Sequence, residues 1–251
     1  MFERFRPQPE PEFVFVVTFG RSGSTLVQGL LNAMPRTLIR GENAFFVKGQ
    51  FESAQAAVTF AERHAKHHAG RKSSAFYGVR NFARPTFVKH ARALSLEMLY
   101  GKVEARSVDR IGFKEVLWHQ IEPDQTEPFF TWFDHVFPGA RFVLNTRTPE
   151  VSVDSGFWKD QDRDLALARM SRVMEIQEWL EQRWPERTYR TRYETLTGAD
   201  AERRDAMLTG LAEFVTGACD PDLLARLHAT LEVGHGPHPF GRSRRASTAT
   251  E

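Results

Sequence analysis

A strand that runs directly into a glycine- and serine-rich turn is the feature that most limits the fold of this chain. Residues 13–19 are mainly aromatic and β-branched, which predicts a strand buried on both faces. The turn Gly20-Arg-Ser-Gly-Ser-Thr25 follows at once, and residues 24–34 continue as a helix that ends near Pro35. A strand, a turn and a helix in this order present unpaired backbone N–H groups at the positive end of a helix dipole, which is a geometry that binds anions.

Strands and helices alternate along the rest of the chain, which predicts an α/β fold with a central, mainly parallel sheet flanked by helices. We expect one domain over residues 13–240, preceded by a flexible arm over residues 1–12 and followed by a disordered tail over residues 241–251. The further expected strands are 111–117, 141–145 and 188–193, and the further expected helices are 52–69, 85–99, 128–137, one that begins with Thr148 as its cap, 162–184, 201–215 and 221–231.

Composition and charge exclude several classes of protein. The chain has 34 Lys and Arg against 32 Asp and Glu, so its net charge of +2 indicates neither a nucleic-acid partner nor an anionic membrane surface. Cys219 is the one cysteine, which excludes an internal disulfide and fits a reducing compartment. No run of about 18 apolar residues occurs, so no stable membrane insertion is expected. We therefore expect a cytoplasmic protein, and the sequence leaves its oligomeric state open.

The glycine turn lacks the lysine that phosphate loops of ATP- and GTP-binding enzymes carry. Against the pattern G-x-x-x-x-G-K-[ST], Gly23 and Thr25 align, but Ser24 stands at the lysine position and Thr18 at the first glycine. That lysine reaches the β- and γ-phosphates, so its absence disfavours a nucleotide kinase-like enzyme. A non-catalytic nucleotide-binding module is the other alternative.

A second candidate anion site follows the strand expected over residues 141–145. Arg147 leaves the carboxyl end of this strand, and we expect Ser155 to lie about two turns into the following helix. Ligands of open α/β sheets bind outside the carboxyl ends of the strands, so Arg147 is expected to face the same crevice as the glycine turn. Two anion sites on one crevice indicate a nucleotide with phosphates at both ends.

Three segments together resemble the sulfotransferases that use 3′-phosphoadenosine-5′-phosphosulfate (PAPS), especially bacterial and carbohydrate-type members. The segment Phe19-Gly-Arg-Ser-Gly-Ser-Thr-Leu-Val27 resembles the family's 5′-phosphosulfate loop. The segment Arg141-Phe-Val-Leu-Asn-Thr-Arg-Thr-Pro-Glu-Val-Ser-Val-Asp-Ser155 resembles its 3′-phosphate segment, although the family's Arg-Asp-Pro is Arg-Thr-Pro here. The segment Tyr189-Arg-Thr-Arg-Tyr-Glu-Thr-Leu196 is similar to its late strand and helix.

The resemblance implies a P-loop-type fold and in-line transfer of a sulfuryl group from PAPS to a hydroxyl acceptor, which leaves PAP as product and requires no metal. A carbohydrate or glycolipid is the expected acceptor, within a wider class of small molecules and glycans. The arginines at 242, 244 and 245 either cover the 3′-phosphate or belong to a solvated tail. The residues implied to bind the donor are Gly20, Arg21, Ser22, Gly23, Ser24 and Thr25 at its 5′ end and Arg147 and Ser155 at its 3′ end.

Three residues are assigned to the chemical step. Arg21 is expected to neutralise charge on the leaving 5′-phosphate. Glu42 is the candidate general base, with a solvated carboxylate or an ion pair with Arg40 as the alternative. Lys114 is expected either to contact the sulfuryl group or acceptor, or to form an ion pair with a buried carboxylate.

Histidines and one tryptophan are candidates for other roles, as an alternative base, as part of the core or as metal ligands. His119 is an alternative base, and Trp118 before it is expected to belong to the core. The sequence shows no ligand spacing typical of a metal site. His64, His67 and His68 share one helical face, but this face is expected to be solvated rather than to bind a metal.

Overall fold

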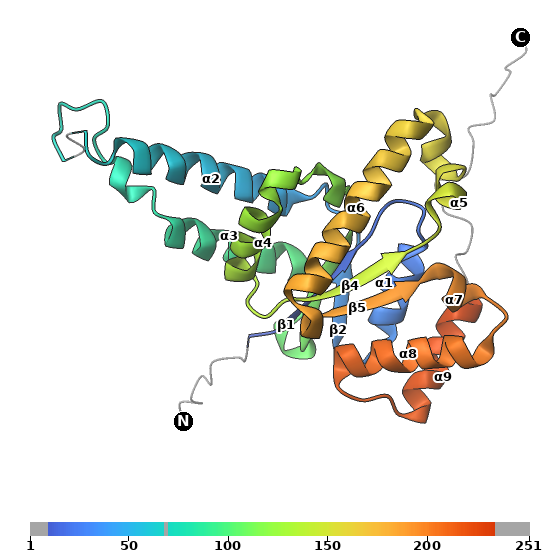
Figure 1. The fold of residues 1–251 in the computed structure, drawn as a ribbon. Coiled ribbons are helices and arrows are strands. Elements are labelled where there is room, and N and C mark those ends of the chain that lie inside the picture. The colour runs from blue at the N-terminus through green and yellow to red at the C-terminus, as the bar shows by residue number, and fades with distance from the viewer. Residues whose placement is uncertain (1–9, 68–69, 234–251) are drawn as a thin grey trace, which may run out of the picture.

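The computed structural model describes residues 10–67 and 70–233, which fold around one parallel sheet (Figure 1). Its order is β2-β3-β1-β4-β5, and every neighbouring pair is parallel, which confirms the predicted α/β class. Residues 1–9 of the predicted arm and the whole predicted tail lie outside the described residues. The strands are β1 (Glu12–Val17), β2 (Thr37–Arg40), β3 (Arg110–Glu115), β4 (Arg141–Thr146) and β5 (Thr188–Arg192).

Helices cover both faces of the sheet, and β1 shows why. Its side chains alternate between two hydrophobic clusters, with Phe13, Phe15 and Val17 on one face and Val14 and Val16 on the other. The first cluster also draws on α2, α3, α4 and α6, and the second on α1, α8 and α9. The helices are α1 (Ser24–Ala33), α2 (Phe46–His64), α3 (Arg84–Tyr100), α4 (Thr126–Val136), α5 (Pro149–Val153), α6 (Arg163–Arg183), α7 (Tyr193–Thr197), α8 (Ala201–Thr216) and α9 (Pro221–Val233).

The structure adds one strand that the sequence analysis missed and corrects one prediction that concerns the site. Strand β2 was not predicted, because its four residues are too few to show an alternating pattern. The helix after Thr148 ends at Val153, so the expectation that Ser155 lies two turns into a helix is wrong. Ser155 has extended backbone, with φ −123° and ψ 137°, and Gly156 follows with a φ of 61°. The chain turns at this point, and Phe157 and Trp158 then pack against Gly20 of the glycine turn.

The carboxyl ends of the five parallel strands lie at one edge of the sheet. The chain leaves β1 at Thr18, β2 at Gly41, β3 at Val116, β4 at Arg147 and β5 at Tyr193. Parallel pairing therefore brings five segments that are far apart in sequence to one edge, where α/β proteins bind ligands. None of the helices in the described ranges is long and apolar enough to cross a bilayer.

The close approach of β3 to β1 leads to a prediction about stability. A Cβ added at Gly112 would lie 1.7 Å from the carbonyl oxygen of Val14. We expect Gly112→Ala to lower the free energy of unfolding by about 3 kcal/mol or more, because the backbone of a central strand cannot move without breaking its hydrogen bonds. Urea unfolding followed by circular dichroism measures the change.

The matched control is Gly49→Ala in α2, where nothing lies within 4 Å of an added Cβ. This substitution is expected to leave the free energy of unfolding unchanged or to raise it by up to about 1 kcal/mol, because alanine favours a helix more than glycine does. Equal stability of the two variants would mean that the packing of β3 on β1 is wrong.

Candidate active site

The glycine turn between β1 and α1 has backbone that only a few residue types adopt readily. Arg21 has a φ of 66° and Gly23 a φ of 80°. Gly23 precedes the first residue of α1 and supplies no side-chain cap, and the first turn of that helix has no acidic residue. Gly23, Ser24 and Thr25 line a cavity of about 320 Å³. An uncapped helix start beside a cavity suits an anionic ligand.

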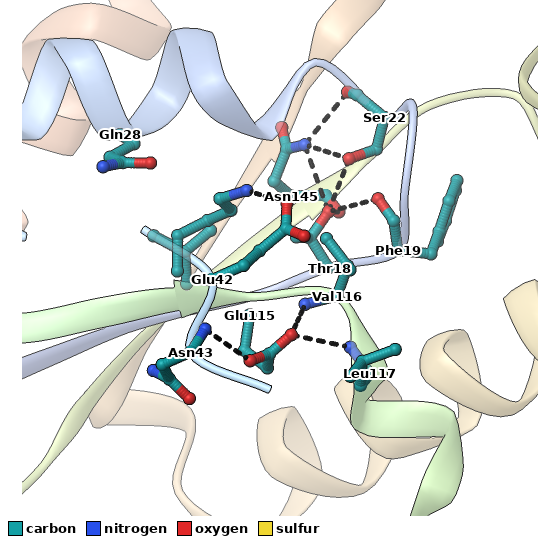
Figure 2. Close-up of polar contacts among 12 residues, drawn as sticks. Thr18, Phe19, Ser22, Gln28, Glu42, Asn43, Glu115, Val116, Leu117 and Asn145 are labelled. Atoms are coloured by element: carbon teal, nitrogen blue, oxygen red, sulfur yellow. Dashed lines mark hydrogen bonds and ion pairs between the residues drawn. The ribbon is translucent and has the colours of Figure 1, made fainter. Parts of the chain in front are cut away.

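A buried polar network fixes the base of this turn (Figure 2). The Thr18 hydroxyl lies 2.6 Å from the Ser22 hydroxyl and donates to the carbonyl oxygen of Asn145 at 3.0 Å. The Asn145 amide donates to the carbonyl and hydroxyl oxygens of Ser22, both at 3.0 Å, and its Oδ1 accepts from Thr191. All four side chains are fully buried. Ser22, expected to bind the donor, therefore directs its hydroxyl into the protein rather than into the cavity.

Aromatic rings pack directly on the two glycines of the turn. The Trp158 indole donates to the carbonyl oxygen of Gly20 at 2.8 Å, and a Cβ on Gly20 would lie 2.5 Å from the ring of Phe157. A Cβ on Gly23 would lie 2.1 Å from the ring of Tyr193. Close packing therefore favours glycine at both positions, and at Gly23 the φ of 80° favours it as well.

Two guanidinium groups meet at the turn. Arg21 Nε donates to the Ser155 hydroxyl and Arg147 Nη1 donates to the carbonyl oxygen of Arg21, both at 3.1 Å. The Arg147 guanidinium also lies 4.5 Å from the ring centroid of Tyr193, and its Nε has no hydrogen-bond partner within the described part of the chain. The expected proximity of Arg147 to the glycine turn is thus present. Arg147 also lines the cavity, and a guanidinium without a carboxylate partner among the described residues suits a phosphate oxygen.

Glu194 holds the segment that carries Arg147. Its Oε1 accepts from the backbone N–H of Thr148 at 2.8 Å and from the Thr148 hydroxyl at 2.9 Å. Burial by itself would raise the pKa of the Glu194 carboxyl, but these hydrogen bonds and the charge of Arg147 lower it below its ordinary value. Thr148 stands at the predicted cap position of α5, yet its side chain binds Glu194 instead of capping the helix.

Glu42 and Lys114 form an ion pair at the cavity. The Lys114 ammonium contacts Oε1 of Glu42, and the lysine side chain is 5% exposed whereas the glutamate is 53% exposed. Of the two roles expected for Lys114, the structure contains an ion pair, but the partner is the half-exposed candidate base rather than a buried carboxylate. Arg40, the alternative partner of Glu42, donates instead to the carbonyl oxygens of Leu99 and Tyr100.

The buried carboxylate of Glu115 joins the ends of β2 and β3 through four backbone N–H groups (Figure 2). Its Oε2 accepts from Asn43 at 3.2 Å and from Phe45 at 2.9 Å. Its Oε1 accepts from Val116 at 2.7 Å and from Leu117 at 3.2 Å. Hydrogen bonds to a carboxylate are stronger than those between neutral groups, so this side chain is a strong link between two strand ends.

Glu115 stabilises the backbone of the loop that carries Glu42. Ala44 and Phe45 have φ values of 56° and 53°, a region that residues other than glycine seldom adopt. The Glu115 carboxylate binds the N–H groups on both sides of Ala44 and so compensates for this strain. The sequence indicated that Glu115 is buried. Neighbouring residues on a strand point to opposite faces, and both faces of this strand are buried, so the residue after Lys114 must be buried as well.

The cavity takes residues from all five strand ends. The predicted residues Ser22, Lys114 and Ser155 are not among its lining residues. Ser22 and Lys114 are buried, whereas Ser155 is partly exposed and accepts from Arg21. Val116, Phe157 and Tyr193 line it without having been predicted. The predicted residues that line the cavity are Gly20, Arg21, Gly23, Ser24, Thr25, Glu42 and Arg147.

The histidines of the α2 segment and the core tryptophan lie apart from this cavity. The His64 ring stacks on Phe76 with centroids 4.2 Å apart, and His68 lies outside the described residues. Trp118 is fully buried, as predicted. Across residues 10–67 and 70–233, no three side chains of His, Cys, Asp or Glu are grouped to hold a metal ion.

The fold and the cavity define an α/β protein with a cavity lined by a glycine turn and two arginines at the carboxyl edge of a parallel sheet. The chain belongs to the Sulfotransferase family, whose sequence model matches residues 11–209. None of the curated proteins compared with the chain matches it.

Two solved structures share the fold. One is the sulfotransferase domain from the curacin biosynthetic pathway, with a TM-score of 0.50 and 18% identity over 87% of this chain and 78% of that domain. The other is the sulfotransferase domain from the Synechococcus PCC 7002 olefin synthase, with a TM-score of 0.53 and 15% identity over 88% of this chain and 78% of that one. These similarities confirm the predicted P-loop-type fold.

The hydrogen bonds of Glu115 lead to a second prediction. In Glu115→Gln, an –NH₂ group replaces one acceptor oxygen and faces two backbone N–H groups that have lost their partner. We expect the free energy of unfolding to fall by about 1–3 kcal/mol, measured by urea unfolding. Glu122→Gln, at an exposed glutamate, should change it by less than about 0.5 kcal/mol. Two variants with the same stability would contradict the role given to Glu115.

Proposed function

We propose that this protein is a PAPS-dependent sulfotransferase that transfers a sulfuryl group to a hydroxyl acceptor. The observation that carries the proposal is the meeting of Arg147, after β4, with the glycine turn, after β1, at one cavity. PAPS has anionic groups at both ends of its adenosine, and two anion-binding segments at one cavity suit such a ligand. Membership of the Sulfotransferase family supports the same activity.

The residues at the cavity fit the two ends of this donor differently. The backbone N–H groups at the start of α1 and the hydroxyls of Ser24 and Thr25 would hold the 5′ end, with Arg21 neutralising its charge. The guanidinium of Arg147, which lines the cavity, and the partly exposed hydroxyl of Ser155 would hold the 3′-phosphate. When bound, PAPS supplies an activated sulfuryl group whose bond to the 5′-phosphate oxygen breaks as the acceptor oxygen attacks in line.

Glu42 is the general base of the proposal. Its carboxylate is half exposed and lines the same cavity as the glycine turn, so it can take the proton of an acceptor hydroxyl that enters there. Lys114 orients this carboxylate and places a positive charge beside the sulfuryl group. His119 is less suited, because it lines a neighbouring cavity rather than this one.

We further propose a carbohydrate or glycolipid hydroxyl as the acceptor and a bacterial-type, cytoplasmic enzyme without a nucleic-acid partner. The near balance of 34 basic and 32 acidic residues gives no general affinity for polyanions, and the single cysteine suits a reducing compartment. The exposed ring of Phe157 lines the cavity and can contact a sugar ring.

The two-ended anion site predicts selectivity for the 3′-phosphate. Isothermal titration should give PAP a dissociation constant about 10- to 100-fold lower than that of ADP, because one charge-assisted interaction is added. Arg147→Gln should remove most of this difference, whereas Arg203→Gln, at an exposed arginine of α8, should preserve it. Equal affinity of the wild-type protein for PAP and ADP, or transfer of phosphate from ATP, would overturn the proposed donor.

The proposed base predicts a separation of turnover from binding. Glu42→Gln should lower kcat by a factor of about 10²–10⁴ while the dissociation constant of PAP stays the same, since the amide cannot accept the proton. A coupled assay of PAP release over a panel of sugar and glycolipid acceptors measures turnover. The control is Glu62→Gln at an exposed glutamate of α2, which should retain full turnover. Full activity of Glu42→Gln combined with loss of activity in His119→Gln would transfer the role of base to His119.

A further inference from the structure

A second cavity adjoins the candidate donor cavity. Its volume is about 210 Å³, and it shares the side chains of Val116 and Phe157 with the first cavity. A larger cavity of about 470 Å³ between α2 and α3 shares no lining residue with the first. Because the smaller cavity shares two wall residues with the cavity that Glu42 lines, an acceptor bound in it can place a hydroxyl beside Glu42. Its remaining wall includes His119, Trp158, Gln161 and Arg169.

Arg169 brings a positive charge to this second cavity. Its Nη1 donates to the neutral side-chain oxygen of Gln161 at 2.6 Å. Within the described ranges Arg169 forms no ion pair with a carboxylate, whereas two other arginines of the same helix do, Arg163 with Asp154 and Arg172 with Glu175 at 3.0 Å. The Arg169 charge is thus left without an acidic partner at the wall of a cavity.

His119, the neighbour of Arg169 at this cavity, adds no second charge to the wall. Burial, and next the charge of Arg169, lower the pKa of the His119 imidazole below its ordinary value, so the ring is neutral at neutral pH. A neutral imidazole and the Gln161 amide can donate and accept hydrogen bonds, while the indole of Trp158 and the ring of Phe157 supply apolar surface. The wall, which also includes Gln120, therefore combines one cation, three polar side chains and two aromatic rings.

We infer that the second cavity binds a carboxylate of the acceptor, with Arg169 as its counter-ion, while the hydroxyl to be sulfated lies in the first cavity. The inference rests on the proposed function and names its substrate class, a hydroxyl compound that carries a carboxylate. The planar guanidinium matches a carboxylate with two parallel hydrogen bonds. A uronic acid sugar and a hydroxy acid both have this chemistry.

Titrations of matched acids and amides test the inference without requiring turnover. Methyl β-glucuronide is compared with its primary amide, and 3-hydroxybutyrate with 3-hydroxybutyramide, each with and without PAP. In the wild-type protein we expect the acid of at least one pair to bind about tenfold or more tightly than its amide, the effect of one charge-assisted interaction. The pair that shows the preference distinguishes a sugar from a non-sugar acceptor. No preference in either pair overturns the inference.

Two variants assign the preference to Arg169. Arg169→Gln should abolish it and Arg169→Lys should retain part of it, because lysine keeps the charge but not the planar geometry. Arg183→Gln, which removes the same charge from the exposed far end of α6, should leave it intact. A preference that survives in Arg169→Gln places the carboxylate elsewhere and refutes the assignment. Failure of PAP to bind the wild-type protein would count against the proposed function alone, because the acid–amide comparison is also made without nucleotide.

Discussion

The side-chain amide of Asn145 joins the carboxyl ends of three neighbouring strands, β1, β4 and β5, and the glycine turn depends on it. Its oxygen accepts from Thr191 at the end of β5, and its nitrogen donates to Ser22 in the turn after β1. Gln177 of α6 adds hydrogen bonds to the carbonyl oxygens of Val17 and Asn145. Fully satisfied networks of this kind give a buried region one well-defined arrangement. The turn is therefore set by the interior, and its outward backbone N–H groups remain free for a ligand.

Charge at the candidate active site is distributed so that each ionic group is held by a different partner. Arg21 is fixed by Ser155, Arg147 by the ring of Tyr193 and a backbone carbonyl, and Glu42 by Lys114. Neither of the two arginines is paired with a carboxylate within the described residues, although Glu194 lies close enough to Arg147 to be affected by its charge. The cavity therefore combines two arginines with a single half-exposed carboxylate, a combination that suits the proposed transfer to a hydroxyl.

Local patterns predicted what depends on local sequence, and long-range contacts decided the rest. The strand, glycine turn and α1 were predictable because their residue types follow one another, and Arg147 because it leaves a clear strand. The position of Ser155 was not, because its segment is bent by contacts with the glycine turn rather than by its own helix propensity. Glu115 and Tyr193 were missed for a related reason. The alternation beside Lys114 indicates that Glu115 is buried, but its partners in the loop after β2 and the glycine on which Tyr193 packs lie far away in sequence, so no pattern within either segment identifies them.

Phe157 lines both cavities, so the binding of a ligand in one cavity can affect the binding of a ligand in the other through this side chain. Its ring packs on the backbone of Gly20 in the first cavity and borders the second cavity with Trp158. Any ligand that displaces this ring changes the free energy of binding in the neighbouring cavity, and thermodynamic linkage makes the effect equal in both directions. Under the proposed function, the affinities for donor and acceptor would be coupled through this one phenylalanine, and a substitution at that position would change the coupling free energy.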